Sequence, residues 1–385
     1  MGRTKERNVK IELIRIVACL LVIMQHITIV PLISETGELY EGVATLIAIF
    51  YKDVPLFLII SGFLMFQKPG EEKITDLWTS YRHKLKNLLL YVFLPSCIIV
   101  AISAVLAPVL TGEQTLSELM AAPDWKLIFV CIRNYIVIQQ TASVYQIFWY
   151  LWVYIEVVMF FPLLAFICQD TKDKNKIRRF LMLLSGLNVL LNDLQVIGWW
   201  TGNFDNITLN KYFLYVLIGY EFYLFVQRAD MKKIRICGAV MFGGGIAVGV
   251  LVERYFYYRQ TLQYMPVVFT IAASAGLFLL LYSLKEPKLP KVWNYLGKET
   301  LYIYMVHILV IFTCKNIWGD FFMNLFGGGS NVLWLILYDI VYGAIIFTIS
   351  MAVGLIFKLF YEKVILFMIE KIASLVKRGG KGSNE

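Results

Sequence analysis

Charged side chains are scarce in this chain of 385 residues: Asp, Glu, Lys and Arg make up 16% of it, whereas 59% is hydrophobic. A soluble protein has about a quarter of its residues charged and about half apolar. The scarcity of charge excludes a water-soluble enzyme fold. Because apolar runs long enough to cross a bilayer recur along the chain, we expect an all-α, polytopic integral membrane protein.

Several patterns with known chemistry are also missing. The six cysteines lack metal-ligand spacing, so we expect unpaired packing residues and no metal site. The glycine runs at 243–245 and 327–329 lack a following Lys-Ser/Thr pair, which disfavours a phosphate loop. The net charge of +9 comes from Lys and Arg spread over short loops without an aromatic binding surface, so no nucleic-acid partner is expected.

Apolar runs predict about ten membrane helices. They cover residues 10–33, 42–66, 85–110, 145–168, 180–200, 211–228, 236–252, 263–284, 299–317 and 331–360. Residues 126–140 are shorter and more polar, so we expect an interfacial or re-entrant segment there, or else an eleventh span. Residues 361–379 alternate apolar and charged groups, which predicts an amphipathic helix on the inner leaflet. We therefore expect a membrane domain at 1–360 and a basic cytoplasmic tail at 361–385.

Lys and Arg are concentrated in every second connection between these runs, beginning with the amino-terminal tail and ending with the segment after the last run. The first intervening loop contains Glu35, Glu38 and Glu41 instead. Because cytoplasmic loops are enriched in Lys and Arg, this alternation predicts that both termini lie in the cytoplasm.

The first run, Lys10 to Val30, is apolar enough to span a membrane, yet it contains Glu12, Arg15 and His26. Charged groups inside a membrane segment are costly, so they are candidate functional residues. Arg15 and His26 are 11 positions apart. At about 100° and 1.5 Å per residue, they share one helix face about 16 Å apart along the axis. The pattern predicts a fixed cation near one membrane surface and a titratable imidazole deep in the span.

Glu12 lies three residues before Arg15, so its carboxylate can pair with the guanidinium and reduce the cost of burying it. Two other interpretations stay open. Arg15 can extend to the lipid headgroups, and His26 can simply hydrogen-bond a neighbouring helix. For two such groups on one face, we favour a functional role.

Of the three histidines, His307 also lies in an apolar run, with Tyr304 one turn earlier on the same face. We expect His26 and His307 to face a shared cavity, although a hydrogen-bonded helix contact would explain His307 equally well. His83 lies in a basic connection, where a solvated position is expected. Four carboxylates in or near apolar runs could be relay, binding or packing groups: Asp53, Glu156, Glu221 and Asp339.

Four stretches in chain order resemble the motifs of membrane acyltransferase family 3. The first is the arginine that ends IELIR, followed after ten residues by a histidine, which here are Arg15 and His26. The others are VPLFLIISGFL at 54–64, FWYLW at 148–152 and GKETLYIYMVHI at 297–308. The resemblance covers most of the chain, and four ordered motifs are far more specific than any one of them.

This resemblance implies a multi-pass protein of the bacterial cytoplasmic membrane that transfers acetyl or another short acyl group. The donor would be a cytoplasmic acyl-CoA such as acetyl-CoA, bound as a substrate, with no permanently bound cofactor. The acceptor would be a hydroxyl of an extracytoplasmic envelope glycan or lipid-linked sugar. Because no esterase-like domain is appended, a separate extracytoplasmic partner protein could complete delivery.

Residue by residue, the resemblance implies that Arg15, His26 and His307 are catalytic. It implies substrate-contact or packing roles for Glu12, Ser61, Gly62, Trp149 and Tyr304. The basic cluster of the family usually contains two arginines, whereas here YRHKLKN contains only Arg82, and Lys84 or Lys86 could substitute. Lysine cannot form the bidentate phosphate contact of arginine. We expect the phosphates of the donor to bind Arg15, Arg82, Lys84 and Lys86.

The chemistry at His26 has two versions, because the imidazole could act as a general base on the acceptor hydroxyl or hold the acyl group covalently. The alternative function is a transporter or substrate-binding membrane domain for a small solute, as in the membrane half of certain serine racemases. In that case Arg15, Glu156, Asp339 and the histidines would line a translocation path.

Overall fold

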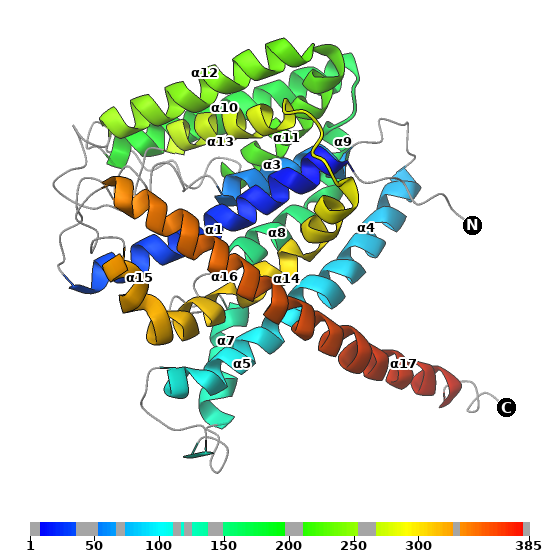
Figure 1. Ribbon diagram of the computed structural model, residues 1–385. Helices are drawn as coiled ribbons and strands as arrows, with labels where there is room; N and C mark the ends of the chain where they lie inside the picture. The colour runs from blue at the N-terminus through cyan, green and yellow to red at the C-terminus, as the bar shows by residue number, and fades with distance from the viewer. Residues whose placement is uncertain are drawn as a thin grey trace. The chain divides into compact units, whose positions relative to one another are not determined.

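The computed structural model is helical almost throughout the residues that it describes, which are 8–35, 53–66, 74–110, 117–118, 125–137, 149–196, 211–252, 267–325 and 332–379 (Figure 1). These residues contain no strand, which confirms the all-α class.

The first half of the chain forms α1 (Val9–Glu35), α3 (Asp53–Met65), α4 (Ile74–Leu88), the π-helix η1 (Leu89–Phe93), α5 (Leu94–Leu110), α7 (Trp125–Val137), α8 (Trp149–Met159), α9 (Phe161–Ile167) and α10 (Lys172–Val196). The second half forms α11 (Lys211–Arg228), α12 (Met231–Val252), α13 (Val267–Tyr282), α14 (Pro290–Cys314), the π-helix η4 (Lys315–Gly319), α15 (Asp320–Leu325), α16 (Val332–Phe360), the π-helix η6 (Tyr361–Leu366) and α17 (Phe367–Gly379).

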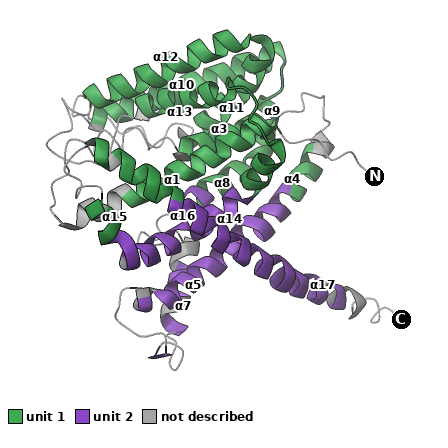
Figure 2. Ribbon diagram, viewed as in Figure 1, with its two compact units in different colours: residues 1–83, 152–298, 320–344 green, residues 84–151, 299–319, 345–385 purple. Residues whose placement is uncertain are grey.

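Two compact units make up the fold (Figure 2). Unit 1 comprises residues 1–83, 152–298 and 320–344, and unit 2 comprises residues 84–151, 299–319 and 345–385. The candidate residues of α1 and α3 belong to unit 1, whereas His307 and Tyr304 of α14 belong to unit 2.

Unit 1 has α3 at the centre of its packing. Helix α3 contacts α1, α11 and α13, and α13 pairs closely with α12. The ring of Phe63 in α3 lies 5.7 Å from that of Tyr223, 5.4 Å from Phe278 and 5.6 Å from Tyr282. Aromatic pairs at such distances stabilise a core beyond the area they bury, so α3 is a rigid support for its neighbours.

Unit 2 is tied together by contacts between segments far apart in the chain. Helices α5 and α7 pack against each other. Helix α16 lies close to α14, because a Cβ on Gly354 would be 3.1 Å from the carbonyl carbon of Tyr302. The buried Tyr361 of η6 donates its hydroxyl to the carbonyl of Leu90 in η1. The contact between Gly354 and Tyr302 holds α16 against the half of α14 that contains His307.

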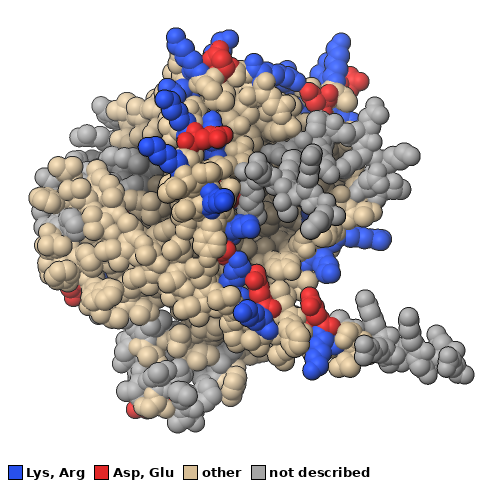
Figure 3. Space-filling view, turned by 45° about the vertical axis from the view of Figure 1, so that its right-hand side comes forward, with Lys and Arg blue, Asp and Glu red and all other residues tan. Residues whose placement is uncertain are grey.

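Long apolar helices support membrane insertion. In the described part of the chain, four are long and apolar enough to cross a bilayer: Leu77–Leu106, Met231–Val252, Pro290–Cys314 and Ile336–Ile372. A bent pair, Tyr150–Met159 with Phe161–Ile167, would make a fifth. A broad part of the surface in Figure 3 shows almost no charged side chain. The membrane class is supported, whereas the larger helix count and the cytoplasmic termini stay predictions.

The helices differ from the predicted runs in three places. The run at 85–110 is preceded by α4, and the two form one continuous helix through η1. The run at 145–168 bends by 66° between α8 and α9, where Pro162 lies in the first turn of α9 and cannot donate a backbone hydrogen bond. Residues 361–379 continue α16 without a break, so the tail is helical, and its place on the inner leaflet stays a prediction.

Candidate functional site

Helix α1 contains the first candidate pair, Arg15 and His26. Because Val9–Glu35 is one uninterrupted helix, the two residues lie on one face about 16 Å apart along the axis, as their spacing predicts. Between them on this face Cys19 and Val22 are buried, whereas Arg15 and His26 are only partly buried. This face of α1 is therefore packed in its middle and keeps some exposed surface at Arg15 and at His26.

Glu12 pairs with Arg15 as the sequence predicts. Nη1 of Arg15 donates to both carboxylate oxygens, at 3.3 Å to Oε1 and 3.2 Å to Oε2. The Glu12 side chain is 4% exposed and that of Arg15 is 26% exposed. Nε and Nη2 of Arg15 make no hydrogen bond or ion pair with any described residue. These two nitrogens form the edge of a guanidinium that binds an oxyanion bidentately, so Arg15 can bind a further anion.

Two other elements of unit 1 approach this end of α1. Tyr154 of α8, two residues after the FWYLW motif, lies within electrostatic range of Arg15. Gly297 of α14, which begins the GKET motif, lies directly against Glu12: a Cβ at this position would be 2.3 Å from Glu12 Oε2. Parts of the first and last of the four sequence motifs therefore meet at the Glu12–Arg15 pair, and Tyr154 lies near them.

Ser61 and Gly62 of α3 serve helix packing. The Ser61 hydroxyl donates to the carbonyl of Phe57 in its own helix at 2.8 Å. A Cβ on Gly62 would be 1.9 Å from the carbonyl oxygen of Val216 in α11, and one on Gly219 would be 2.1 Å from that of Ile59. Two glycines therefore allow α3 and α11 to touch backbone to backbone. This contact gives the Ser-Gly-Phe motif a packing role.

His307 and Tyr304 of α14 form the candidate group of unit 2. The His307 side chain is fully buried, and its Nδ1 contacts the carbonyl of Tyr304. A carbonyl only accepts, so this contact requires a proton on Nδ1. The Tyr304 ring lies 5.3 Å from that of His307 and 5.7 Å from that of Tyr150. The predicted shared face of Tyr304 and His307 is confirmed, whereas the cavity shared with His26 stays a prediction.

The basic cluster lies in helix α4, not in a loop. Arg82 and Lys86 are exposed, and Lys84 is partly buried. Arg82 belongs to unit 1, and both lysines belong to unit 2. Trp149 is the first residue of α8, and its side chain lies outside the described part of the chain. The expected binding role of these four residues stays a prediction.

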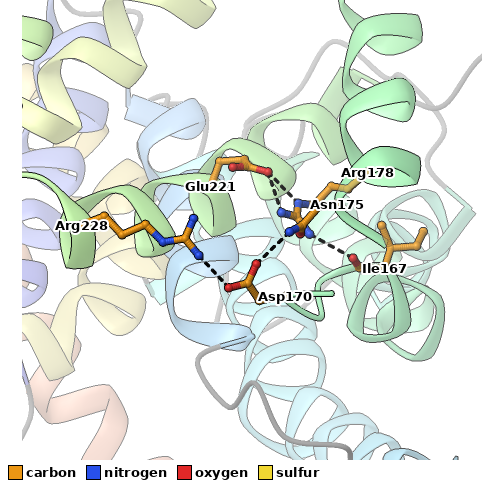
Figure 4. A network of polar contacts seen from close by, with 6 residues as sticks. All are labelled: Ile167, Asp170, Asn175, Arg178, Glu221 and Arg228. Carbon is orange, nitrogen blue, oxygen red and sulfur yellow. Dashed lines mark hydrogen bonds and ion pairs between the residues drawn. The ribbon is translucent and has the colours of Figure 1, made fainter. Parts of the chain in front are cut away.

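A second arginine–glutamate pair lies elsewhere in unit 1 (Figure 4). Arg178 of α10 is fully buried. Its Nε donates to Glu221 Oε1 at 2.8 Å, Nη2 lies 2.7 Å from the same oxygen, and Nη1 donates to the carbonyl of Ile167 at 3.2 Å. The guanidinium also lies over the ring of Tyr220, 4.7 Å from its centroid. Nε and Nη1 of Arg178 are therefore hydrogen-bonded to protein oxygens, whereas Nη2 is paired with Glu221 by charge without a hydrogen bond.

Asp170 continues this network towards the surface. It accepts from Asn175 Nδ2 at 2.8 Å and pairs with Arg228 Nη2 at 2.7 Å. The sequence pattern places Arg178 among the cations of a cytoplasmic connection. Arg178 is not an exposed loop cation, because α10 begins at Lys172 and its second turn directs Arg178 into the unit; the side of the membrane on which this connection lies stays a prediction.

Sequence reasoning missed Tyr154 and Gly297 at the Arg15 end of α1. Gly297 begins the GKETLYIYMVHI motif, but its contact with Glu12 joins two segments far apart in the chain, which no local periodicity relates. Tyr154 follows an aromatic motif without a distinctive spacing to Arg15. Both contacts depend on how the helices pack in three dimensions, which local sequence patterns do not specify.

Comparison with known proteins gives one match. A family model described as an acyltransferase domain matches residues 8–358. Neither curated proteins nor solved structures gave a match. The matched range includes all four motifs and ends near the close of α16.

Proposed function

The chain belongs to membrane acyltransferase family 3, and from this membership we propose that it is an O-acyltransferase of the bacterial cytoplasmic membrane. Its donor is a cytoplasmic acyl-CoA, with acetyl as the leading acyl group and no permanently bound cofactor. Its acceptor is a hydroxyl of an envelope glycan or lipid-linked sugar on the opposite side of the bilayer. A separate extracytoplasmic protein can present that acceptor.

The open edge of Arg15 is the observation that supports this proposal most directly. Nε and Nη2 are without a partner in the described residues, while Glu12 holds Nη1. A phosphate of acyl-CoA matches this edge in charge and geometry. The exposed Arg82 and Lys86 and the partly buried Lys84 of α4 supply further positive charge for a donor that has several phosphates.

His26 is the proposed site of acyl transfer, about 16 Å from Arg15 along the same helix face. With the phosphates at Arg15, the pantetheine arm passes beside the buried Cys19 and Val22 of α1 and brings the thioester towards the imidazole. The neutral imidazole accepts the proton of the acceptor hydroxyl while the hydroxyl oxygen attacks the thioester carbonyl. The C–S bond then breaks, and the imidazolium returns the proton to the departing CoA thiolate. A covalent acyl-histidine would reach the same products in two steps.

Transfer of labelled acetyl from acetyl-CoA tests the proposal with membranes that contain the wild-type chain or a variant. Membranes with the wild-type chain should acylate an envelope glycan fraction. His26→Ala should reduce the rate of acyl transfer by about a hundredfold or more, because general acid–base catalysis contributes that much. His83→Ala is the matched control, since His83 is an exposed residue of α4. It should retain wild-type turnover.

Two results would contradict the proposal. Equal turnover by the wild-type chain and His26→Ala would remove His26 from the mechanism. Acyl-CoA-independent uptake of a small solute into liposomes, without any acyl transfer, would instead favour the transporter alternative.

A further inference from the structure

Gly297 of α14 and Glu12 of α1 lie directly against each other in unit 1. A Cβ built on Gly297 would lie 2.3 Å from Oε2, 2.6 Å from Cβ and 3.1 Å from Cα of Glu12. The first atom ends a side chain that could rotate away. The other two move only with the backbone of α1, so a side chain at position 297 would force the two helices apart.

This contact also explains how Glu12 is buried. Its side chain is 4% exposed although it is ionisable and lies in an apolar helix. Buried carboxylates need a cation and a close-packed surrounding that fixes their geometry, because a loose pair loses more in desolvation than it regains in attraction. The bare backbone of Gly297 lets α14 cover the carboxylate while its oxygens still reach Nη1 of Arg15.

The pairing in turn determines the orientation of the guanidinium. With Nη1 directed to Glu12, the opposite edge, made by Nε and Nη2, is turned away from the carboxylate. If Glu12 were displaced, Arg15 would lose its only hydrogen-bonding partner among the described residues, and its long side chain would regain rotamer freedom. The donor would then have to order the arginine on binding, which weakens affinity.

We propose that Gly297 is a positioning residue for acyl transfer: the missing side chain holds Glu12 on Arg15 and so presets the arginine edge that receives the donor. The inference rests on the proposed function of Arg15. It links the first and last sequence motifs through one contact, although residues 12 and 297 are in different helices.

Steady-state kinetics of Gly297→Ala with acetyl-CoA test the functional half of this inference. We expect the KM for the donor to rise about tenfold, the equivalent of one lost charged hydrogen bond, while the KM for the acceptor stays unchanged. Gly243→Ala is the matched control, because a Cβ on that helical glycine would meet nothing within 4 Å. Its kinetics should match those of the wild-type chain.

Gly276→Ala separates positioning from general packing. A Cβ there would be 2.2 Å from the backbone nitrogen of Phe242, so this variant should lower the thermal midpoint of the detergent-solubilised protein. It should leave the ratio of donor KM to acceptor KM unchanged. If Gly276→Ala raised the donor KM selectively, as Gly297→Ala is expected to do, the positioning role would be overturned.

A double-mutant cycle with Glu12→Gly tests the contact itself without any activity assay. Removal of the Glu12 side chain eliminates the two shortest clashes, so Gly297→Ala should lower the thermal midpoint of the wild-type chain but hardly that of Glu12→Gly. An equal drop in both backgrounds would refute the contact. A wild-type chain that turns over no acyl-CoA would overturn the proposed function, whereas turnover with no change in donor KM for Gly297→Ala would overturn only the role of Gly297.

Discussion

Two arginines of unit 1, Arg15 and Arg178, each pair with a glutamate. They differ in how many guanidinium nitrogens remain available to a ligand. Arg178 is fully buried, and its Nε and Nη2 both face Oε1 of Glu221 while Nη1 donates to a backbone carbonyl. Arg15 is 26% exposed and gives only Nη1 to Glu12. The same bidentate edge is therefore filled by protein in one arginine and open in the other.

This difference is the one expected between a structural ion pair and the donor-binding group that we propose for Arg15. A buried guanidinium whose nitrogens all meet protein oxygens has nothing to offer a ligand, and its pair fixes the α9–α10 connection to α11. A half-paired guanidinium with exposed surface keeps charge and donors for a second anion. Under the proposed function, the unused donors of Arg15 distinguish it from Arg178, whereas the charge that both carry does not.

The largest expected effect comes from replacing Arg15, the arginine with the open guanidinium edge. Arg15→Ala should lower kcat/KM for the donor about a thousandfold, because truncation of a group that contacts a charged ligand costs 2 to 5 kcal/mol. The kcat/KM of Arg15→Lys for the donor should lie between those of the wild-type chain and Arg15→Ala, since a single ammonium cannot pair with Glu12 and also bind a phosphate bidentately. Labelled acetyl transfer across a range of donor concentrations measures both.

The thermal midpoint of Arg15→Ala should also fall, because the variant leaves the buried Glu12 carboxylate, whose side chain is 4% exposed, without its cation; kcat/KM is therefore measured on the molecules that remain folded. Arg179→Ala, an exposed neighbour of Arg178, is the matched control and should leave transfer intact. If Arg15→Ala and Arg179→Ala reduced kcat/KM to the same extent, Arg15 would be no more than a surface charge.

Arg178→Ala removes the buried Arg178–Glu221 pair, and it should change the stability of the protein instead of its affinity for the donor. It leaves the Glu221 carboxylate without its cation, which should lower the free energy of unfolding by about 3 kcal/mol. Thermal unfolding in detergent measures this loss. The molecules that remain folded should keep the wild-type KM for the donor, and a selective rise in that KM would mean that Arg178 also contacts the donor.

Arg228→Ala serves as the comparison for this loss. It removes the outer pair with Asp170, whose side chains are 64% and 29% exposed for Arg228 and Asp170. Exposed pairs contribute less than about 1 kcal/mol. A loss from Arg228→Ala as large as that from Arg178→Ala would show that the network acts as one unit.

Local patterns predicted what lies within one helix. The i, i+3 spacing placed Glu12 on Arg15, and the same spacing placed Tyr304 beside His307, because helix geometry alone determines which side chains meet. The apolar runs likewise located helices such as α1 and α11. In each case the interacting residues are neighbours along one turn.

Contacts between helices were beyond such patterns. Arg178 and Glu221 are 43 positions apart, and the charge of Arg178 resembled that of the exposed lysines around it. Gly297 reaches Glu12 only because α14 packs on α1 at that level. Which face of a helix is buried, and against which partner, depends on the packing of the whole unit, so neither contact could be derived from spacing.

Tyr220→Phe gives the smallest expected effect and the finest test of how closed the Arg178 site is. The hydroxyl of Tyr220 is buried and has no hydrogen-bond partner among the described residues, whereas its ring stacks on the Arg178 guanidinium. Removing only the hydroxyl should keep the ring contact and relieve an unsatisfied polar atom, which raises stability by about 1 kcal/mol. Tyr361→Phe is the matched control, because its hydroxyl donates to Leu90 and its loss should lower the thermal midpoint. If Tyr220→Phe also lowered the midpoint, the hydroxyl would have a polar partner, and the interpretation of Tyr220 as an unsatisfied polar group beside Arg178 would be wrong.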